Sequence, residues 1–254
     1  MALVSCQTIP TEEQLTEVDK ESIQSNRTTL ICEFSGYLCT NCPNAAEEAH
    51  KLLGVWGENL VVVEMHPASN SFTRYTKEEF NYTCEAADIY YKAFGGLPTT
   101  GLPTGVINLN GSFTEYPLWG GAYIQSAVQQ STVAMSATTE YDVATRTLSA
   151  TVTLDNLDQK EQDIRLIAWL TEDGIVGAQK MPDGSSRTDY VHNHLLRDTL
   201  TQAWGEPIKL QASRTHTLVP YIISDRCVAE NCQLVVLALR DEEVVQAVQV
   251  PVIR

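Results

Sequence analysis

The sequence lacks several features that would assign it to a common functional class. It has no run of eighteen apolar residues, so it contains no candidate transmembrane helix. Only 17 residues are Lys or Arg against 32 Asp or Glu, which gives a net charge of −15. Because phosphate binding requires clustered cations, this balance argues against a nucleic-acid partner. No nucleophile elbow supports hydrolysis by a Ser-His-Asp triad.

Cysteine, in contrast, is frequent in this chain. Seven cysteines are present, and six of them fall in close or plausible pairs. Paired cysteines are rare in reducing compartments, so the count predicts an oxidising one. A chain of 254 residues can bury a sizeable core, so the pairs are not needed merely to compensate for small size.

Residues 1–27 resemble the tether of a bacterial lipoprotein. Leu3-Val4-Ser5-Cys6 is similar to a lipobox, the motif in which a lipid is attached to the cysteine after cleavage. The segment that follows is polar and weakly patterned, as a tether would be. The resemblance implies lipid attachment at Cys6 and an anchor in the membrane. The alternative is a free cysteine in a disordered N-terminal segment.

The apolar spacing predicts an α/β domain over residues 28–133. Strands are expected at Thr28–Phe34 and Leu60–Met65, with a helix at Asn44–Trp56 between them, which together form a βαβ unit. A helical insertion is expected over 67–96, followed by a strand within 101–111 and a closing helix at Ala122–Val133. One face of the insertion helix would carry Phe80, Cys84, Ala87, Tyr91 and Phe94.

From about Met135 the apolar period changes to two. Leu148, Ala150, Val152 and Leu154 alternate with Ser and Thr, and similar patterns recur over 164–170, 217–223, 233–239 and 244–252. Several antiparallel strands at this spacing predict an all-β, immunoglobulin-like sandwich over residues 134–254.

Cys39 and Cys42 stand where the first helix is expected to begin. Unpaired backbone N–H groups and the helix dipole at that position favour an anion, so they lower the pKa of the Cys39 thiol. The thiolate is the attacking species in disulfide exchange, and Cys42 would close the ring and release the substrate. Glu33, six residues earlier on the strand beneath, could take the proton from Cys42.

Leu102-Pro103 precedes a predicted strand, where a cis X–Pro bond would fit. In that geometry the backbone of Leu102 faces the sulfur pair and can bind an extended peptide as an added strand.

These residues occur in the order seen in the thioredoxin-like superfamily. Glu-Phe with Cys-x-x-Cys, then Gly-Leu-Pro-Thr and Asn-Gly, resembles that superfamily over residues 28–133. The resemblance implies that Cys39 is the nucleophile, Cys42 the resolving cysteine, Glu33 the buried acid and Pro103 the cis-proline. Leu38 replaces a frequent Trp, and Thr40-Asn41 replaces Gly-Pro. Because the two intervening residues tune the reduction potential, the direction of exchange is not implied.

A second resemblance covers nearly the whole chain. Phe-Ser-Gly-Tyr-Leu-Cys-Thr-Asn-Cys-Pro at 34–43, the segment Tyr190–Arg197 and Trp204-Gly-Glu resemble the outer-membrane-protein-twenty-eight-related family. These are envelope lipoproteins of Gram-negative bacteria with a thioredoxin-like front and an immunoglobulin-like back. The resemblance implies the architecture and a location at the outer membrane, on either its periplasmic or its surface side.

The remaining cysteines and histidines carry open alternatives. Cys227 and Cys232 are expected to form a structural disulfide, whereas Cys32 and Cys84 either pair or remain buried thiols. The histidines of His192-Asn-His194 could share a strand face and a metal, but no third ligand is indicated, so no metal is assigned. Cys39-x-x-Cys42 is also half of a zinc site, but the second half is missing.

The leading hypothesis is thiol–disulfide exchange on exported proteins or peptides through Cys39 and Cys42, with Leu102 and Pro103 binding the substrate. The cysteines carry the electrons, so no cofactor is implied. The alternative is a non-catalytic binding lipoprotein in which the scaffold is retained and Cys39–Cys42 is a structural disulfide.

Overall fold

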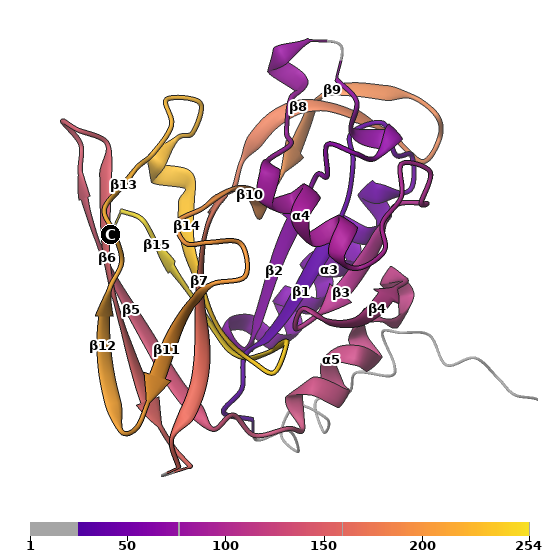
Figure 1. Ribbon diagram of the computed structural model, residues 1–254. Helices are drawn as coiled ribbons and strands as arrows, with labels where there is room; N and C mark the ends of the chain where they lie inside the picture. The colour runs from indigo at the N-terminus through magenta and orange to yellow at the C-terminus, as the bar shows by residue number, and fades with distance from the viewer. Residues whose placement is uncertain (1–24, 76, 159, 254) are drawn as a thin grey trace, which may run out of the picture.

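An α/β half and a β-sandwich share one continuous sheet in this protein (Figure 1). The computed structural model describes residues 25–75, 77–158 and 160–253, so Cys6 lies outside the described residues. The strands of the shared sheet are β1 (Thr29–Phe34), β2 (Leu60–Met65), β3 (Thr104–Ile107), β4 (Asn110–Thr114), β7 (Gln162–Glu172), β10 (Leu195–Thr199), β11 (Glu206–Leu210), β14 (Cys232–Arg240) and β15 (Glu243–Pro251). They follow the order β15-β14-β7-β10-β2-β1-β3-β4, and β11 also pairs with β7.

The expected βαβ unit is confirmed. Strands β1 and β2 are parallel, and helix α3 (Cys42–Trp56) connects them. Every residue of both strands is buried because helices cover the two faces of the sheet. Helices α3 and α5 (Trp119–Ala127) pack on one face, where the rings of Trp56 and Tyr123 stack with centroids 4.3 Å apart. Helix α4 (Glu85–Ala93) packs on the other face through Tyr90 and Tyr91.

Two helices differ from their expected limits. Helix α4 begins only after Cys84, and Phe80 lies in a separate 3-10 turn at Glu78–Phe80. The Asn81 side chain accepts hydrogen bonds from both the backbone and the hydroxyl of Thr83, a local turn that competes with helix. The closing helix α5 also ends earlier than expected, at Ala127.

The second sheet of the sandwich confirms the predicted alternation. It contains β5 (Val133–Asp142), β6 (Thr147–Asn156), β12 (Ser213–Thr217) and β13 (Tyr221–Ile222). Along β6, residues 148, 150, 152 and 154 are buried, and their neighbours are more exposed. They pack against the inner residues of β7 and β14, including Leu166, Leu170, Leu234 and Val236.

A hairpin formed by β8 (Ile175–Lys180) and β9 (Ser186–His192) leaves the sandwich and extends over the α/β half (Figure 1). Strand β10 follows the hairpin and lies between β7 and β2. Leu195 pairs with Glu64 of β2, and the Glu64 N–H donates to the carbonyl of His194 at 2.9 Å. A segment from the range expected for the sandwich therefore belongs to the same sheet as the βαβ unit.

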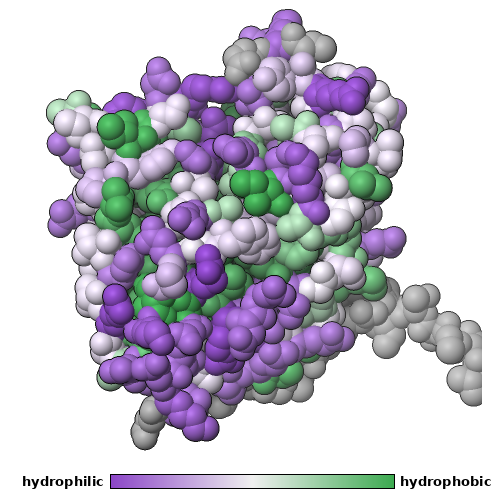
Figure 2. All heavy atoms as spheres, viewed as in Figure 1, coloured by the Kyte–Doolittle hydropathy of each residue, from purple (hydrophilic) through white to green (hydrophobic). Residues whose placement is uncertain are grey.

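The surface mixes polar and apolar side chains. On the face shown in Figure 2, hydrophobic side chains form small patches that are separated by hydrophilic ones. None of the helices within the described ranges is both long enough and apolar enough to span a membrane.

Candidate functional site

The predicted Cys39–Cys42 disulfide is confirmed and lies at the beginning of α3. The two Cα atoms are 5.5 Å apart, and the Cys42 N–H donates to the sulfur of Cys39 at 3.1 Å. Pro43 follows in the first turn, where its missing N–H costs no hydrogen bond. Residues 39–43 therefore place the Cys39 sulfur at the N-terminus of α3.

Leu102-Pro103 lies opposite this disulfide, as the sequence predicts. Its peptide bond is cis, and the carbonyl oxygen of Leu102 contacts the Cys39 sulfur at 3.2 Å. Strand β3, which begins at Thr104, pairs antiparallel with β1 and so holds this segment near the start of α3.

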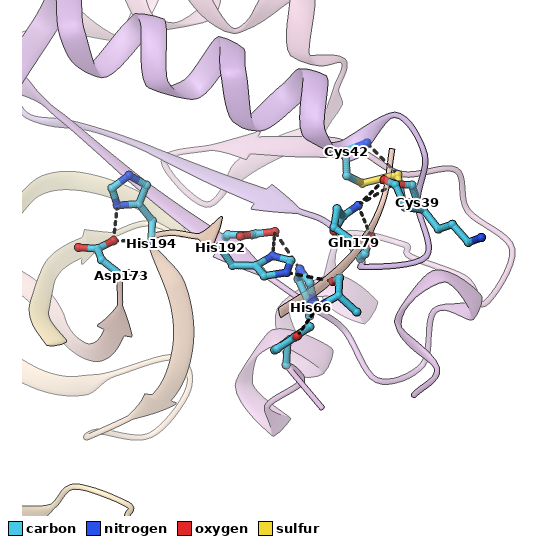
Figure 3. A network of polar contacts seen from close by, with 12 residues as sticks. Cys39, Cys42, His66, Asp173, Gln179, His192 and His194 are labelled. Carbon is cyan, nitrogen blue, oxygen red and sulfur yellow. Dashed lines mark hydrogen bonds and ion pairs between the residues drawn. A yellow bond between two sulfur atoms is a disulfide. The ribbon is translucent and has the colours of Figure 1, made fainter. Parts of the chain in front are cut away.

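The disulfide is covered, in contrast to the open site that exchange with an incoming chain requires. Cys39 and Cys42 are each only 2% exposed. The side-chain amide of Gln179 in β8 donates to the Cys39 carbonyl at 2.9 Å (Figure 3), and the Lys180 N–H donates to the carbonyl of Tyr37 at 2.8 Å. The hairpin is therefore hydrogen-bonded directly to the loop that carries the cysteines.

Glu33 lies on the face of β1 that α3 covers. It is 2% exposed, and its Oε1 has no hydrogen-bond partner among the described residues. Burial raises the pKa of Glu33 well above its usual range, and the negative charge of Glu64, its neighbour across the β1–β2 register, adds to this effect. A cavity of about 250 Å³ is lined by Glu33 and by Pro43, the residue that follows Cys42. The expected acid is therefore near the helix start.

A cluster that the sequence did not predict joins Glu64 with His66 and His192 (Figure 3). The His66 Nε2 lies 2.8 Å from Glu64 Oε1, and the His192 Nδ1 lies 3.9 Å from the same oxygen. Burial lowers the pKa of His66, which favours a neutral ring. Burial alone would raise the pKa of Glu64, but the two adjacent imidazoles outweigh it and lower that pKa. The alternation Glu64-Met-His66 at the end of β2 is the sequence signal that could have shown two of these residues on one face.

His194 does not join His192, although the sequence allowed the two rings to share a face. Strand β9 ends at His192, and His194 has a positive φ of 59° that turns its side chain away from strand alternation. Its Nδ1 lies 3.1 Å from Asp173 Oδ1 instead (Figure 3).

The expected Cys227–Cys232 disulfide is not formed in the structure, where both residues are free thiols. The hydrogen bond from the Cys232 thiol lowers the pKa of Cys227 to about 7, and the Arg197 guanidinium, whose Nε donates to the Cys227 sulfur at 3.4 Å, acts in the same direction. Cys32 and Cys84 are also free thiols, so the unpaired alternative holds for them; burial raises the pKa of both, to about 11 for Cys84.

Two solved structures are similar to this chain over most of its length. HBP35 of Porphyromonas gingivalis matches with a TM-score of 0.69 and 14% identity, covering 89% of this chain and 75% of that one. Protein AGR_C_4864 from Agrobacterium tumefaciens matches with a TM-score of 0.56 and 12% identity, covering 89% and 96%. At these identities the likeness shows the fold alone. No curated protein matches the chain.

A family model assigns the chain to a protein family, which the two solved structures do not. The family described as Outer membrane protein Omp28 matches residues 87–254, which is more than half of the chain. The match begins within α4 and includes the hairpin, β10 and the whole sandwich, and the family's name indicates association with the outer membrane. This chain belongs to the Omp28 family of outer membrane proteins.

Proposed function

We propose that this protein is a non-catalytic interaction protein of the outer membrane, in which a thioredoxin-like scaffold keeps Cys39–Cys42 as a structural disulfide. The observation that carries the proposal is that each cysteine is only 2% exposed, in a loop to which the β8–β9 hairpin is hydrogen-bonded. Exchange requires an attacking thiolate to reach one of the two sulfurs, and this burial denies the approach. The α/β half and the immunoglobulin-like sandwich then act as one platform for a ligand or protein partner.

Thiol–disulfide exchange on exported proteins or peptides is the second candidate. It is favoured by the 3.2 Å contact between the Cys39 sulfur and the Leu102 carbonyl, which brings the sulfur to the backbone where a substrate strand would bind. In this scheme the Cys39 thiolate attacks a substrate disulfide and forms a mixed disulfide, and one substrate sulfur leaves as a thiolate. Cys42, whose proton passes to Glu33, then attacks the Cys39 sulfur and releases the other. The hairpin has to move away first.

One measurement separates the two candidates. For a structural disulfide, we expect a reduction potential below about −300 mV, no reduction of insulin, and a lower free energy of unfolding in the protein with Cys39→Ser and Cys42→Ser. For an exchange enzyme, the potential should lie in the range of about −270 to −120 mV, and Cys39 should alkylate rapidly after mild reduction. A potential in that second range, together with insulin reduction, would overturn the structural proposal.

The membrane anchor is a separate part of the proposal. A lipid on Cys6 would hold the protein at the outer membrane, in agreement with the lipobox-like residues before it. Labelling with radioactive palmitate in a bacterial host should mark the wild-type protein and be lost in Cys6→Ala. Label that persists in Cys6→Ala would contradict the anchor.

A further inference from the structure

The cluster of Glu64, His66 and His192 has the donor atoms of a metal site. One ligand atom from each residue lies within 4.8 Å of the others. Glu64 lies in β2 and His66 directly follows that strand, whereas His192 ends β9, so the cluster joins the α/β half to the hairpin. Their exposed fractions are 8%, 1% and 1%, so solvent does not satisfy these groups.

The hydrogen bond of His192 directs its free nitrogen toward Glu64. Its Nε2 donates to the backbone carbonyl of Ala178 at 3.2 Å, so in the neutral ring Nδ1 carries the lone pair. Metal-binding histidines are commonly held in this way, with the second ring nitrogen bonded to a carbonyl. Nδ1 then faces the carboxylate oxygen of Glu64, and a cation between these two acceptors would satisfy both.

The distance between His192 and Glu64 fits an ion better than a direct hydrogen bond. The separation of 3.9 Å between His192 Nδ1 and Glu64 Oε1 is too long for a hydrogen bond. Two ligands that each lie about 2.0–2.2 Å from a zinc ion can be at most about 4.4 Å apart, so one ion can reach both atoms. His66 Nε2 now donates to the same oxygen at 2.8 Å, and it would complete a set of three ligands once its proton is released on metal binding.

Unsatisfied buried atoms around the cluster provide an independent observation. His192 Nδ1, the atom that would bind the ion, and Glu33 Oε1 on the cavity wall are buried without a hydrogen-bond partner in the described part of the chain. Such orphaned polar atoms are costly, and native proteins contain few of them. The 250 Å³ cavity is lined by Glu33, Glu64 and His192, so it supplies a path to the cluster and room for a fourth ligand.

We propose that Glu64, His66 and His192 bind one divalent transition-metal ion, with Zn²⁺ as the best match to two imidazoles and a carboxylate. The cavity beside Glu64 and His192 has room for a water molecule as the fourth ligand. The ion would link the end of β2 to the end of β9 and so fix the hairpin that is hydrogen-bonded to the Cys39 loop. This site is independent of whether Cys39–Cys42 is structural or active.

The test is zinc binding by the full chain after dialysis against EDTA, measured by competition with a chromogenic chelator. We expect one equivalent of Zn²⁺ per chain and a loss of affinity of more than about 100-fold in His192→Ala and in His66→Ala, because even supporting residues of zinc sites change affinity 10–100-fold. His216→Ala, on β12 in the second sheet of the sandwich, is a matched control that should retain binding. Equal affinity in His192→Ala and wild type would overturn the proposal.

Two further measurements test whether the ion binds at this cluster rather than at another site. The Cys227 and Cys232 thiols could also bind zinc, so the protein with Cys227→Ser and Cys232→Ser should keep its full affinity; loss of binding in that variant would assign the ion elsewhere and overturn the proposal. If His66→Ala or His192→Ala does not fold, the absorption spectrum of Co²⁺ bound to the wild-type chain tests the site instead. Intense d–d absorption typical of tetrahedral nitrogen and oxygen ligands, without thiolate charge-transfer bands, supports the site, and its absence overturns it.

Discussion

Cys227 shows how one neighbour can change the chemistry of a thiol. The Cys232 hydrogen bond and the Arg197 guanidinium lower the pKa of Cys227 from 9.0 to about 7, whereas burial raises that of Cys84 to about 11. Near neutral pH the Cys227 thiol is therefore more strongly ionised than an unperturbed cysteine, whose pKa is about 8.5. A lowered pKa means that the thiolate is present above pH 7 and is lost as the pH falls below it.

We expect thiolate absorbance at 240 nm to rise around pH 7 in reduced protein that carries Cys39→Ser and Cys42→Ser. Cys227→Ser should remove this step, and Arg197→Gln should move it to higher pH because the cation is lost. Cys84→Ser is the control and should leave the step unchanged. A first rise only near pH 9 would show that the Cys232–Cys227 hydrogen bond does not stabilise the thiolate.

Gly36 is the second residue whose surroundings lead to a prediction. A Cβ at this position would lie 2.7 Å from the backbone oxygen of Phe72, which accepts a hydrogen bond from the Leu38 N–H. We expect Gly36→Ala to lower the free energy of unfolding by about 1–3 kcal/mol, as overpacking against backbone does. Urea unfolding followed by circular dichroism measures this change.

Gly54 provides the control for that measurement. It lies in α3, and a Cβ there meets nothing within 4 Å. Gly54→Ala should therefore raise the free energy of unfolding by about 0.5–1 kcal/mol, because alanine favours helix over glycine. Equal effects of the two substitutions would show that the Phe72 backbone moves aside at little cost.

At the scale of elements, the β8–β9 hairpin is hydrogen-bonded to the loop that carries the disulfide. Gln179 is 3% exposed and donates to the carbonyls of Cys39 and Lys180. If opening of the hairpin limits attack, Gln179→Ala should speed reduction of Cys39–Cys42 by dithiothreitol about tenfold. That factor equals about 1.4 kcal/mol, which is in the range for a lost buried hydrogen bond. Alkylation and mass spectrometry after timed reduction provide the rate.

Gln162 offers a matched control for Gln179. It is also buried and makes several hydrogen bonds, but it lies on β7 within the sandwich. Gln162→Ala should weaken the fold without changing the rate of reduction. If both variants accelerate reduction equally, the disulfide opens through global unfolding rather than through movement of the hairpin.

The same hairpin marks the limit of what the sequence could predict. Local apolar patterns predicted β1, α3, β2 and the alternation of β6, and spacing placed Cys39 opposite Leu102-Pro103. Strand β9, in contrast, is mostly exposed and polar and carries no alternating signal. The meeting of His192 with Glu64 depends on β10 pairing with β2, a long-range choice that no local pattern encodes.

At the scale of the whole molecule, β10 makes the two halves one structural unit. Leu196 of β10 is 1% exposed and belongs to a core cluster that also contains Val63 of β2 and Trp169 of β7. A core shared in this way couples the βαβ unit to the sandwich, so their unfolding should be cooperative. The alternative is two domains that unfold at different denaturant concentrations.

Leu196→Ala tests this coupling. Truncation of a fully buried leucine should lower the free energy of unfolding by about 2–5 kcal/mol, whereas Ile222→Ala, at a position that is 70% exposed, should change it by less than about 0.5 kcal/mol. In hydrogen exchange at rising urea concentration, peptides from β1 and from β6 should lose protection at the same urea concentration. In Leu196→Ala that concentration should be lower for both peptides. If β6 stays protected after β1 has exchanged, the shared sheet does not couple the halves, and β10 is only a docked edge of the sandwich.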